Sequence, residues 1–390
     1  MITSVELTNF RGHASTVVPL DGRLTVLVGP NGVGKTNVLN AVHLLGQAFF
    51  KTPEELFRGS RSAEWLIRSN PASAEHSPMG TSAIRLDGCT EARHAKWWAM
   101  LSLEAAGAEA ARPEDSDVSR AKLSWWPADL KNGDNLEGSA SPGSPEAKKA
   151  PYEVKEAASA VVLKLEARAL AAPSTSEEVE PRIEYDGTGL ATALKELKAT
   201  HLEDFQRFEE SARRVIPELR AIGFERVKRV EDVRTPMTVE SQRVWVSKKE
   251  TVIADGLLLQ FENTRPLPAH CASEGTILVV GLLAFLHLPS RPKVVLLDDI
   301  DRGLHPRAQV ELVSRIREIL NARIDLQVIA TSHSPYLADC LEPEEVVVLS
   351  RPTGGVVSAR RLAEHPNKKL LQSFKTGEFL SASGEDWFGL

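Results

Sequence analysis

The strongest chemical signal in the sequence is a glycine-rich segment near the N-terminus. Residues 29–36 read GPNGVGKT and fit the pattern GxxxxGK[ST]. Glycines in this pattern let successive backbone N–H groups turn inward around phosphate oxygens, and the following helix adds its dipole. Lys35 would reach the β and γ phosphates of ATP, and the Thr36 hydroxyl would ligate Mg²⁺. The alternative is a chance turn, but an apolar run before the segment and a helical pattern after it favour phosphate binding.

A pair of carboxylates at the end of an apolar run is the second signal. Residues 293–306 read KVVLLDDIDRGLHP. A short apolar run that ends in acid is typical of a buried strand that delivers carboxylates to a site. Asp298 would hold the magnesium through water, and Asp299 would lie beside the γ phosphate and orient the attacking water. The alternative is a pair of strand-end aspartates that caps a turn.

Three shorter motifs are weak when each is taken alone. SEGT at residues 273–276 is a good helix start, with serine as the N-cap and glutamate in the first turn. His333 in TSHSP follows an apolar run, where a lone histidine is usually a satisfied polar residue. Arg11 in NFRGH precedes the glycine-rich segment by about twenty residues and could be an exposed arginine in a turn.

The elements that must position these residues follow from apolar periodicity. Alternating or continuous apolar runs predict strands at residues 4–7, 24–29, 82–86, 96–106, 159–170, 243–249, 256–263, 326–333 and 346–350. Helical spacing predicts helices at residues 37–50, 190–220, 277–288 and 307–322. Pro217 leaves the end of the 190–220 helix open. That helix could be a short arm, or a helix packed over an insertion.

Composition describes an ordinary globular chain of 390 residues with a net charge of −6. The charge argues against a wholly basic surface but leaves room for a local basic groove. The three cysteines are far apart, which favours neither disulfides nor a zinc site and fits a reducing cytoplasm. No signal-peptide pattern is present, and the most apolar stretch, residues 277–288, is too short to span a bilayer.

Two further segments stand out by composition. Residues 107–151 are rich in Ala, Gly, Pro, Ser and charge, and this predicts a flexible linker that cannot pack a core. A locally basic segment could contact DNA phosphates, or could be a solvated helix face interleaved with glutamates. Its basic residues are Arg207, Arg213, Arg214, Arg220, Arg226, Lys228 and Arg229.

The motifs NFRGH, GPNGVGKTN, SEGT, LLDDIDRGLHP and TSHSP follow one another in an order that resembles one branch of the ABC-type ATPases. This is the OLD-like and SMC/RecF-like branch, often described as bacterial AAA-family ATPases of phage defence or DNA metabolism. GLHP after the acidic strand is typical of that branch. Two further segments, residues 171–194 and the tail TGEFLSASGEDWF, are similar to stretches of its small stand-alone members.

The resemblance implies an α/β P-loop NTPase fold, an ABC-type ATPase head with an inserted middle region. The head would comprise residues 1–58 and 250–390. Residues 59–249 would supply strands of the head, followed by an inserted region with the linker 107–151 and the long helix 190–220. Two chains would meet head to tail as an ATP-dependent homodimer and enclose two ATP molecules with Mg²⁺.

The resemblance also assigns roles to residues of each ATP site. Catalytic residues would be Lys35, Asp299 and His333, and the magnesium ligands would be Thr36 and Asp298. One chain would bind the nucleotide, and the other would contribute Ser273 and Gly275 at the γ phosphate. The residues of the first chain would be Arg11, Asn31, Gly32, Gly34, Lys35, Thr36 and Asn37.

The sequence departs from the family pattern in several respects. Asp299 stands where the family has glutamate, so its carboxylate lies one methylene nearer the backbone and hydrolysis should be slow, or the protein is chiefly a binding switch. No convincing Q-loop is present, and Gln47 is a poor candidate. We also expect no TOPRIM-like nuclease, no zinc-hook CxxC and no coiled coil of SMC length.

Two classes of function remain open. The first is an ATPase that acts with DNA in genome maintenance or phage defence. The second is an ATP-gated sensor that restrains or releases a separately encoded effector protein, without a direct nucleic-acid role. A transporter ATPase is a distant third, because NFRGH and the large insertion do not fit it. No membrane association is expected, and the predicted localisation is cytoplasmic.

Overall fold

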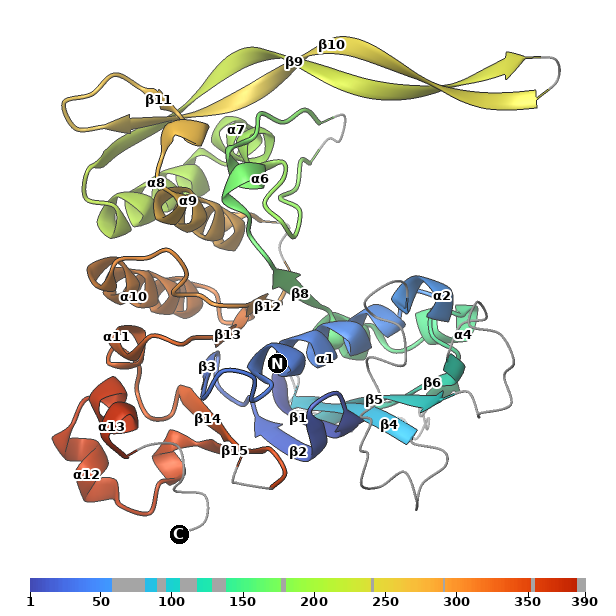
Figure 1. Cartoon of the computed structure of the whole chain (residues 1–390), viewed down its shortest axis with the longest axis vertical. Helices are drawn as coiled ribbons and strands as arrows, with labels where there is room; N and C mark the ends of the chain where they lie inside the picture. The colour runs from blue at the N-terminus through green and yellow to red at the C-terminus, as the bar shows by residue number, and fades with distance from the viewer. Residues whose placement is uncertain are drawn as a thin grey trace. The chain divides into compact units, whose positions relative to one another are not determined.

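The computed structural model describes residues 1–57, 81–89, 96–105, 118–127, 138–176, 180–239, 242–289, 292–351 and 355–383. They form two compact units, whose elements are labelled in Figure 1. The first unit comprises Met1–Leu163, Pro292–Arg302 and Ile316–Leu390. The second comprises Lys164–Arg291 and Gly303–Arg315.

An antiparallel sheet in the first unit has the strand order β2-β1-β4-β5-β6-β7. Alternate residues of β4 are buried, which is the pattern of a sheet with one face on a core. The strands are β1 (Ile2–Phe10), β2 (His13–Pro19), β4 (Thr81–Cys89), β5 (Lys96–Ala105), β6 (Val118–Pro127) and β7 (Gly138–Ala140).

A second sheet of this unit has the order β15-β14-β3-β13-β12-β8, and all its pairings except β14 with β15 are parallel. Every residue of β3, β12, β13 and β14 is buried, as expected for parallel strands covered on both faces. The strands are β3 (Leu24–Val28), β8 (Ala160–Leu163), β12 (Val294–Leu297), β13 (Gln327–Thr331), β14 (Val346–Ser350) and β15 (Ser358–Arg361).

Helix α1 (Lys35–Ala48) lies against both sheets of the first unit. It contacts β1, β4 and β5 of the antiparallel sheet and β8, β12 and β13 of the parallel sheet. Nine of its 14 residues are buried, so it is a core helix rather than a surface helix. Gly46 permits the closest approach, because a Cβ there would lie 2.2 Å from the carbonyl oxygen of Ala158 at the end of α5 (Tyr152–Ala158).

Short helices complete the first unit. Ser334 caps the first turn of α11 (Pro335–Ala338), and α13 (Thr376–Ser383) packs on α11. The others are α2 (Pro53–Leu56), α4 (Pro145–Lys148), the 3-10 turn η3 (Leu362–Glu364) and α12 (Lys368–Ser373).

A buried glutamine joins the two sheets of the first unit. The Nε2 amide of Gln327, at the start of β13, lies 2.8 Å from Ile2 O, 2.7 Å from Leu20 O and 3.1 Å from Gly22 O, and donates to these carbonyls. Its Oε1 accepts from the backbone N–H of Ile2 at 2.8 Å. The side chain therefore satisfies buried backbone groups of Ile2 in β1 and of Leu20, and it also binds Gly22 in the loop between β2 and β3.

The second unit is built on helices and one long β-ribbon. Helix α9 (Glu274–His287) is buried almost throughout, and α6 (Ala167–Ala171), α7 (Leu190–Thr200) and α8 (Leu202–Val215) contact it. Helix α10 (Pro306–Ala322) begins in this unit and ends in the first. The 3-10 turn η2 (Ala269–Cys271) precedes α9.

The ribbon consists of β9 (Leu219–Val239) and β10 (Gln242–Phe261), which pair antiparallel over nearly their whole length. The short strand β11 (Leu267–Pro268) adds to β10 only at the base. Figure 1 shows the ribbon extending well beyond the helices of the same unit.

Most predicted elements of the ATPase-like ends are confirmed, but the helix predicted at residues 190–220 is wrong as a single element. It is interrupted at His201 (φ −133°, ψ 62°), and α8 starts with Glu203 and Asp204 in its first turn, where acidic side chains favour a new helix start. The helix ends at Val215 because Pro217 disfavours helical geometry at the residue before it.

Strand predictions were less accurate in the middle of the chain. Only Ala160–Leu163 of the run 159–170 is a strand, since Ala167–Ala171 is helical. The two strands predicted at 243–249 and 256–263 are parts of one strand, β10, and β9 was not predicted.

The linker prediction is wrong for part of its range. Within residues 107–151 the structure contains β6, β7 and α4, and Leu123 and Trp125 of β6 lie in the core of the first unit. Residues 107–117 and 128–137 lie outside the described residues.

The boundaries of the two compact units can be compared with the predicted head and inserted region. Strands β4 to β8, from the range predicted to supply strands to the head, lie in one unit with β1 and β3. Helix α9, which was predicted in the head, lies in one unit with α7 and α8. No helix among the described residues combines the length and the apolar character needed to cross a membrane.

Gln327→Leu should lower the free energy of unfolding by about 2–4 kcal/mol, because it leaves buried backbone groups without partners. Urea unfolding followed by circular dichroism would measure the change. Gln206→Leu on the exposed side of α8 is the matched control and should change stability by less than about 0.5 kcal/mol. Equal midpoints for both variants would contradict the role given to Gln327.

Candidate functional site

The carboxyl ends of three parallel strands meet at one edge of the sheet in the first unit. Strand β13 lies between β3 and β12, with Thr331 opposite Leu27 and Ala330 opposite Leu297. The segments that follow these strands are the glycine-rich segment, the aspartate pair and TSHSP. Ligands of open α/β sheets bind beyond the carboxyl ends of the strands, so this edge is the candidate site.

The glycine-rich segment needs its glycines for conformation. Gly29, Gly32 and Gly34 have φ values of +145°, +77° and +113°, which side chains rarely adopt. A Cβ at Gly29 would lie 2.3 Å from Leu349 O, whereas a Cβ at Gly32 would meet nothing within 4 Å. Asn31 and Gly32 are exposed at the top of the turn. The segment therefore combines a packed base with an open face, as a phosphate-binding loop requires.

Lys35 begins α1 and is buried within this loop. Its Nζ donates to Gly29 O at 2.6 Å and to Pro30 O at 3.0 Å. The Nζ also lies 3.4 Å from the Nδ1 of His333. The ammonium group is thus placed between the glycine-rich loop and the end of β13.

Asp298 is the centre of a hydroxyl network. Its Oδ1 accepts from the Thr36 hydroxyl at 2.9 Å and from the Thr331 hydroxyl at 2.8 Å. Thr331 Oγ1 also accepts from the backbone N–H of Asp299 at 2.8 Å. Thr331 therefore orients Asp298 through the Asp298 side chain and Asp299 through the Asp299 backbone.

The oxygen atoms of Thr36 and Asp298 fit a magnesium ion that is shared with a nucleotide. Mg²⁺ prefers hard oxygen ligands, keeps several waters and is commonly held by one or two protein side chains together with phosphates. Across the described residues no group of three or more His, Cys, Asp or Glu side chains is placed to hold a metal by itself. The donor set thus suits a nucleotide-bound metal better than an all-protein metal site.

Asp299 and His333 face each other next to this network. Asp299 has φ +51°, a left-handed conformation that aspartate tolerates better than most residues. Its Oδ1 lies 3.8 Å from His333 Nε2, and both side chains are 40–51% exposed. Asp301 Oδ1 accepts from the backbone N–H of His333 at 3.2 Å, so this third aspartate holds the histidine segment.

The NFRGH turn supports the glycine-rich loop from the antiparallel sheet. Arg11 Nη1 donates to Asn37 Oδ1 in the first turn of α1 at 2.9 Å. His13 is fully buried, and its Nε2 lies 3.3 Å from Gly34 O. A Cβ at Gly34 would lie 2.4 Å from this Nε2, so His13 fills the space behind the loop.

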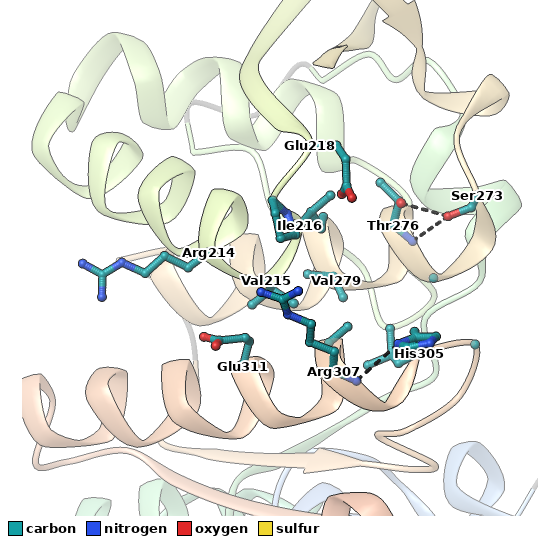
Figure 2. Close-up of a pocket in the computed structure, with 15 residues that line it drawn as sticks. Arg214, Val215, Ile216, Glu218, Ser273, Thr276, Val279, His305, Arg307 and Glu311 are labelled. Carbon is teal, nitrogen blue, oxygen red and sulfur yellow. Dashed lines mark hydrogen bonds between the residues drawn. The ribbon is translucent and has the colours of Figure 1, made fainter. Parts of the chain in front are cut away.

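Ser273 and Gly275 belong to the second unit, where they line a cavity of about 330 Å³ (Figure 2). Ser273 is the N-cap of α9, and its Oγ donates to Thr276 Oγ1 at 2.8 Å and accepts from Thr276 N at 3.2 Å. Gly275 lies so close to the GLHP loop that a Cβ would be 2.2 Å from Gly303 O. His305 of the GLHP loop and Arg307 in the first turn of α10 line the same cavity.

The arginines of α8 are engaged with carboxylates rather than forming an open cationic face. Arg207 pairs with Glu203 and Asp204, and Arg220, just after α8, pairs with Glu262. Arg213 and Arg214 pair with the glutamates four residues earlier. These pairs favour the interpretation of a solvated helix face over a site for DNA phosphates.

Comparison with known families decides the classification. A family model described as "AAA domain, putative AbiEii toxin, Type IV TA system" matches residues 137–339, just over half of the chain. The chain belongs to this family. A second family model, described as "AAA ATPase domain", matches residues 1–95 of this AAA-family protein. This match includes the glycine-rich loop.

Solved structures show the fold of this AAA-family protein. It aligns with the "SmcHead bound to the C-winged helix domain of ScpA" with a TM-score of 0.57 at 14% identity, over 95% of this chain and 99% of that one. An Smc head domain with an extended coiled coil, derived from Pyrococcus furiosus, gives 0.55 at 13% identity, over 95% and 98% of the two chains. The chain therefore has the α/β P-loop NTPase fold of SMC heads.

Curated relatives match only a short stretch. The DNA replication and repair protein RecF of Rhizobium leguminosarum is 50% identical over 44 residues, 11% of this chain and 12% of that protein. The DNA double-strand break repair Rad50 ATPase of Methanopyrus kandleri is 43% identical over 65 residues, 16% of this chain and 7% of that protein. The likeness thus spans a small fraction of each relative's length.

The structure brings most of the predicted site residues of this AAA-family ATPase together in one unit. The contacts given above connect five of them: Lys35, Thr36, Asp298, Asp299 and His333. Arg11 contacts Asn37, the residue after Thr36 in α1. Sequence analysis missed Thr331 and His13. Thr331 is the first residue of TSHSP and His13 the last of NFRGH, so both motifs contained the signal, but only one residue of each was assigned a role.

Thr331→Val should raise the Mg²⁺ concentration needed for half-maximal ATPase activity by about 10–100-fold, because Asp298 loses a donor that orients it. A titration of ATPase activity with MgCl₂ would measure this, and Thr331→Ser should behave like the wild type. The matched control is Thr25→Val in β3, since Thr25 is also buried but its hydroxyl has no hydrogen-bond partner. An unchanged Mg²⁺ requirement in Thr331→Val would exclude Thr331 from positioning Asp298.

Proposed function

We propose that this chain binds ATP with Mg²⁺ at the edge formed by β3, β12 and β13, hydrolyses it slowly, and dimerises on ATP as a conformational switch in DNA metabolism or phage defence. The observation that carries the proposal is the contact of Thr36 with Asp298 beside the buried Lys35 ammonium. A hydroxyl and an ammonium group at the start of α1, with a carboxylate beside them at the end of β12, are what a nucleoside triphosphate with its metal needs.

Binding is assigned to the glycine-rich loop and the residues around it. Backbone N–H groups of residues 31–36 would surround the phosphates, and Lys35 would exchange its two carbonyl partners for phosphate oxygens. Thr36 and Asp298 would hold Mg²⁺, which when bound neutralises charge on the β and γ phosphates. Arg11 would fix Asn37 and thus the first turn of α1.

Catalysis is assigned to Asp299 with His333. A general base must lie within hydrogen-bond distance of the water that it activates, directly or through another water. An aspartate reaches about 1.5 Å less far than a glutamate at the same position. The left-handed backbone at Asp299 aims its carboxylate toward His333, and this supports a base that acts slowly or through a relay.

Asp299→Asn should lower the ATP hydrolysis rate by roughly 10²–10⁴-fold while ATP binding is retained, because the amide cannot accept the proton of the attacking water. Asp299→Glu should hydrolyse ATP faster than the wild type. Phosphate release and calorimetric ATP binding would be measured side by side, with Lys35→Ala as the variant that loses binding itself. Hydrolysis at the wild-type rate in Asp299→Asn would exclude Asp299 as the base.

Dimerisation is assigned to Ser273 and Gly275 through the start of α9. The exposed Ser273 and the N–H groups of the first turn would receive the γ phosphate that a second copy binds. Gly275 has a packing role in any case, since Gly303 O leaves no room for a side chain. Nucleotide hydrolysis would then release the contact and open the dimer.

Ser273→Arg should abolish ATP-dependent dimerisation but leave ATP binding to the monomer intact, because the arginine would occupy the position of the phosphate. Light scattering with and without ATP would show this. Ser144→Arg, which removes the N-cap of α4 in the same way, is the matched control and should dimerise normally. If Ser273→Arg still forms the dimer, SEGT is only a helix cap.

A second candidate function is an ATP-gated sensor that restrains or releases a separately encoded effector. The carboxylate pairing of the α8 arginines favours it, because these arginines already have carboxylate partners within the same helix. The family description names a putative toxin of a "Type IV TA system", which also supports a separate protein partner. The short matches to RecF and Rad50 support the DNA-related function instead. ATPase assays with and without DNA, combined with a pull-down, would separate the two.

A further inference from the structure

The segment TGEF at residues 376–379 forms the start of α13 and docks on α11 in the first unit. The functions proposed above make no use of it. Helix α11 begins at Pro335, two residues after His333. The docking thus occurs directly beside the segment that carries His333, one of the predicted catalytic residues.

The threonine and the glycine of TGEF make the closest contacts. Thr376 is buried, and its hydroxyl donates to Leu341 O, just beyond α11, at 2.8 Å. A Cβ at Gly377 would lie 2.0 Å from Pro335 O and 2.8 Å from Asp339 Oδ1. Since Pro335 O is a backbone atom, only glycine allows α13 to approach this closely.

The glutamate and the phenylalanine extend the docking. Asp339 Oδ1 accepts from the backbone N–H of Gly377 at 2.8 Å and of Glu378 at 3.0 Å, so a carboxylate at the end of α11 caps the positive end of α13. Phe379 is 3% exposed and packs edge-on against His365 with the ring centres 4.9 Å apart. Each residue of TGEF therefore has a specific contact.

The other end of the histidine segment is held by the site itself. Thr331 Oγ1 donates to Asp298, and the backbone N–H of His333 donates to Asp301. Ser334 then caps α11 and donates its N–H to Ser332 Oγ at 3.0 Å. Residues 331–335 thus run between two fixed points, the aspartates on one side and the α11–α13 contact on the other.

We propose that TGEF is a positioning element for His333: by docking on α11 it fixes the segment 331–335 and keeps the histidine beside Asp299 and Lys35. The catalytic consequence rests on the proposed ATPase function. Removing the contact should lower turnover, because His333 then samples positions away from Asp299 and Lys35. Nucleotide affinity should change little, because the glycine-rich loop and Thr36 are not part of this contact.

The test compares Thr376→Val, which deletes the buried hydrogen bond but keeps the branched side chain, with Thr376→Ser, which keeps the hydroxyl. Amide hydrogen exchange of residues 331–341 would be measured in the full chain by mass spectrometry, together with kcat and the Kd for ATP. We expect Thr376→Val to exchange about fivefold to tenfold faster in this segment and to lose a similar factor in kcat, with Kd within about twofold of the wild type. Thr376→Ser should have the exchange rate and the kcat of the wild type.

Gly377→Ala is a second variant with a stronger expected effect, because its methyl group meets a backbone oxygen. Its matched control is Gly223→Ala in β9, where a Cβ would make only an ordinary contact of 3.8 Å with Leu258. Faster exchange of residues 331–341 in Gly377→Ala, with wild-type exchange in Gly223→Ala, would support the docking role. Wild-type exchange in both Thr376→Val and Gly377→Ala would overturn it.

Two other outcomes separate this proposal from the proposed ATPase function. Faster exchange with an unchanged kcat would overturn the positioning of His333 and leave TGEF with a role in stability only. A wild-type chain that hydrolyses no ATP would overturn the ATPase function, whereas the exchange rates would still decide whether TGEF fixes the segment 331–335.

Discussion

The site depends on the parallel pairing of β3, β13 and β12, which brings three hydroxyl and carboxylate groups from distant parts of the sequence to one point. Thr36, Asp298 and Thr331 are separated by as many as 295 residues, yet Asp298 Oδ1 is within 2.9 Å of both hydroxyl oxygens. The pairing of Leu297 with Ala330 puts Asp298 and Thr331 side by side at the carboxyl ends of β12 and β13. Thr36 comes from the first turn of α1, which follows β3 through the glycine-rich loop.

The antiparallel sheet packs on α1 as well, and residues next to its strands help to hold the glycine-rich loop and β13 in place. Gln327 binds Ile2 and the loop before β3, while His13 and Arg11 contact the glycine-rich loop and the first turn of α1. Helix α1 is consequently buried between two sheets, and its N-terminus is held at both Gly34 and Asn37. A phosphate-binding loop in this setting loses little further freedom when it binds a ligand, which favours affinity.

Sequence patterns predicted the parts of the site whose residues act within a short segment. They missed residues whose roles depend on partners far away in the sequence. The glycine-rich loop could be predicted because its glycines, lysine and threonine act within eight consecutive residues. The role of Thr331 could not, since its partner Asp298 is 33 residues away and a threonine after a strand is common. His13 was missed for the same reason, because its contact with Gly34 depends on how the NFRGH turn packs. The break at His201 and the strand β9 were missed because regularly spaced charged residues continue from α8 into β9, and such a pattern fits a solvated helix as well as a two-stranded ribbon.

The base of the β9–β10 ribbon has a consequence for its entire length. Leu257 and Leu259 of β10 lie opposite Phe224 and Ile222 of β9, and Phe224 packs against Phe205 of α8. A slip of one residue in the pairing would carry the buried leucines into solvent, so these few pairs select one alignment for the two strands. Farther out, Val230 and Ile253 are exposed, so this part of the ribbon takes the alignment that the base sets. Errors in pairing should therefore originate at the base and propagate outward, whereas local fraying near the tip leaves the alignment unchanged.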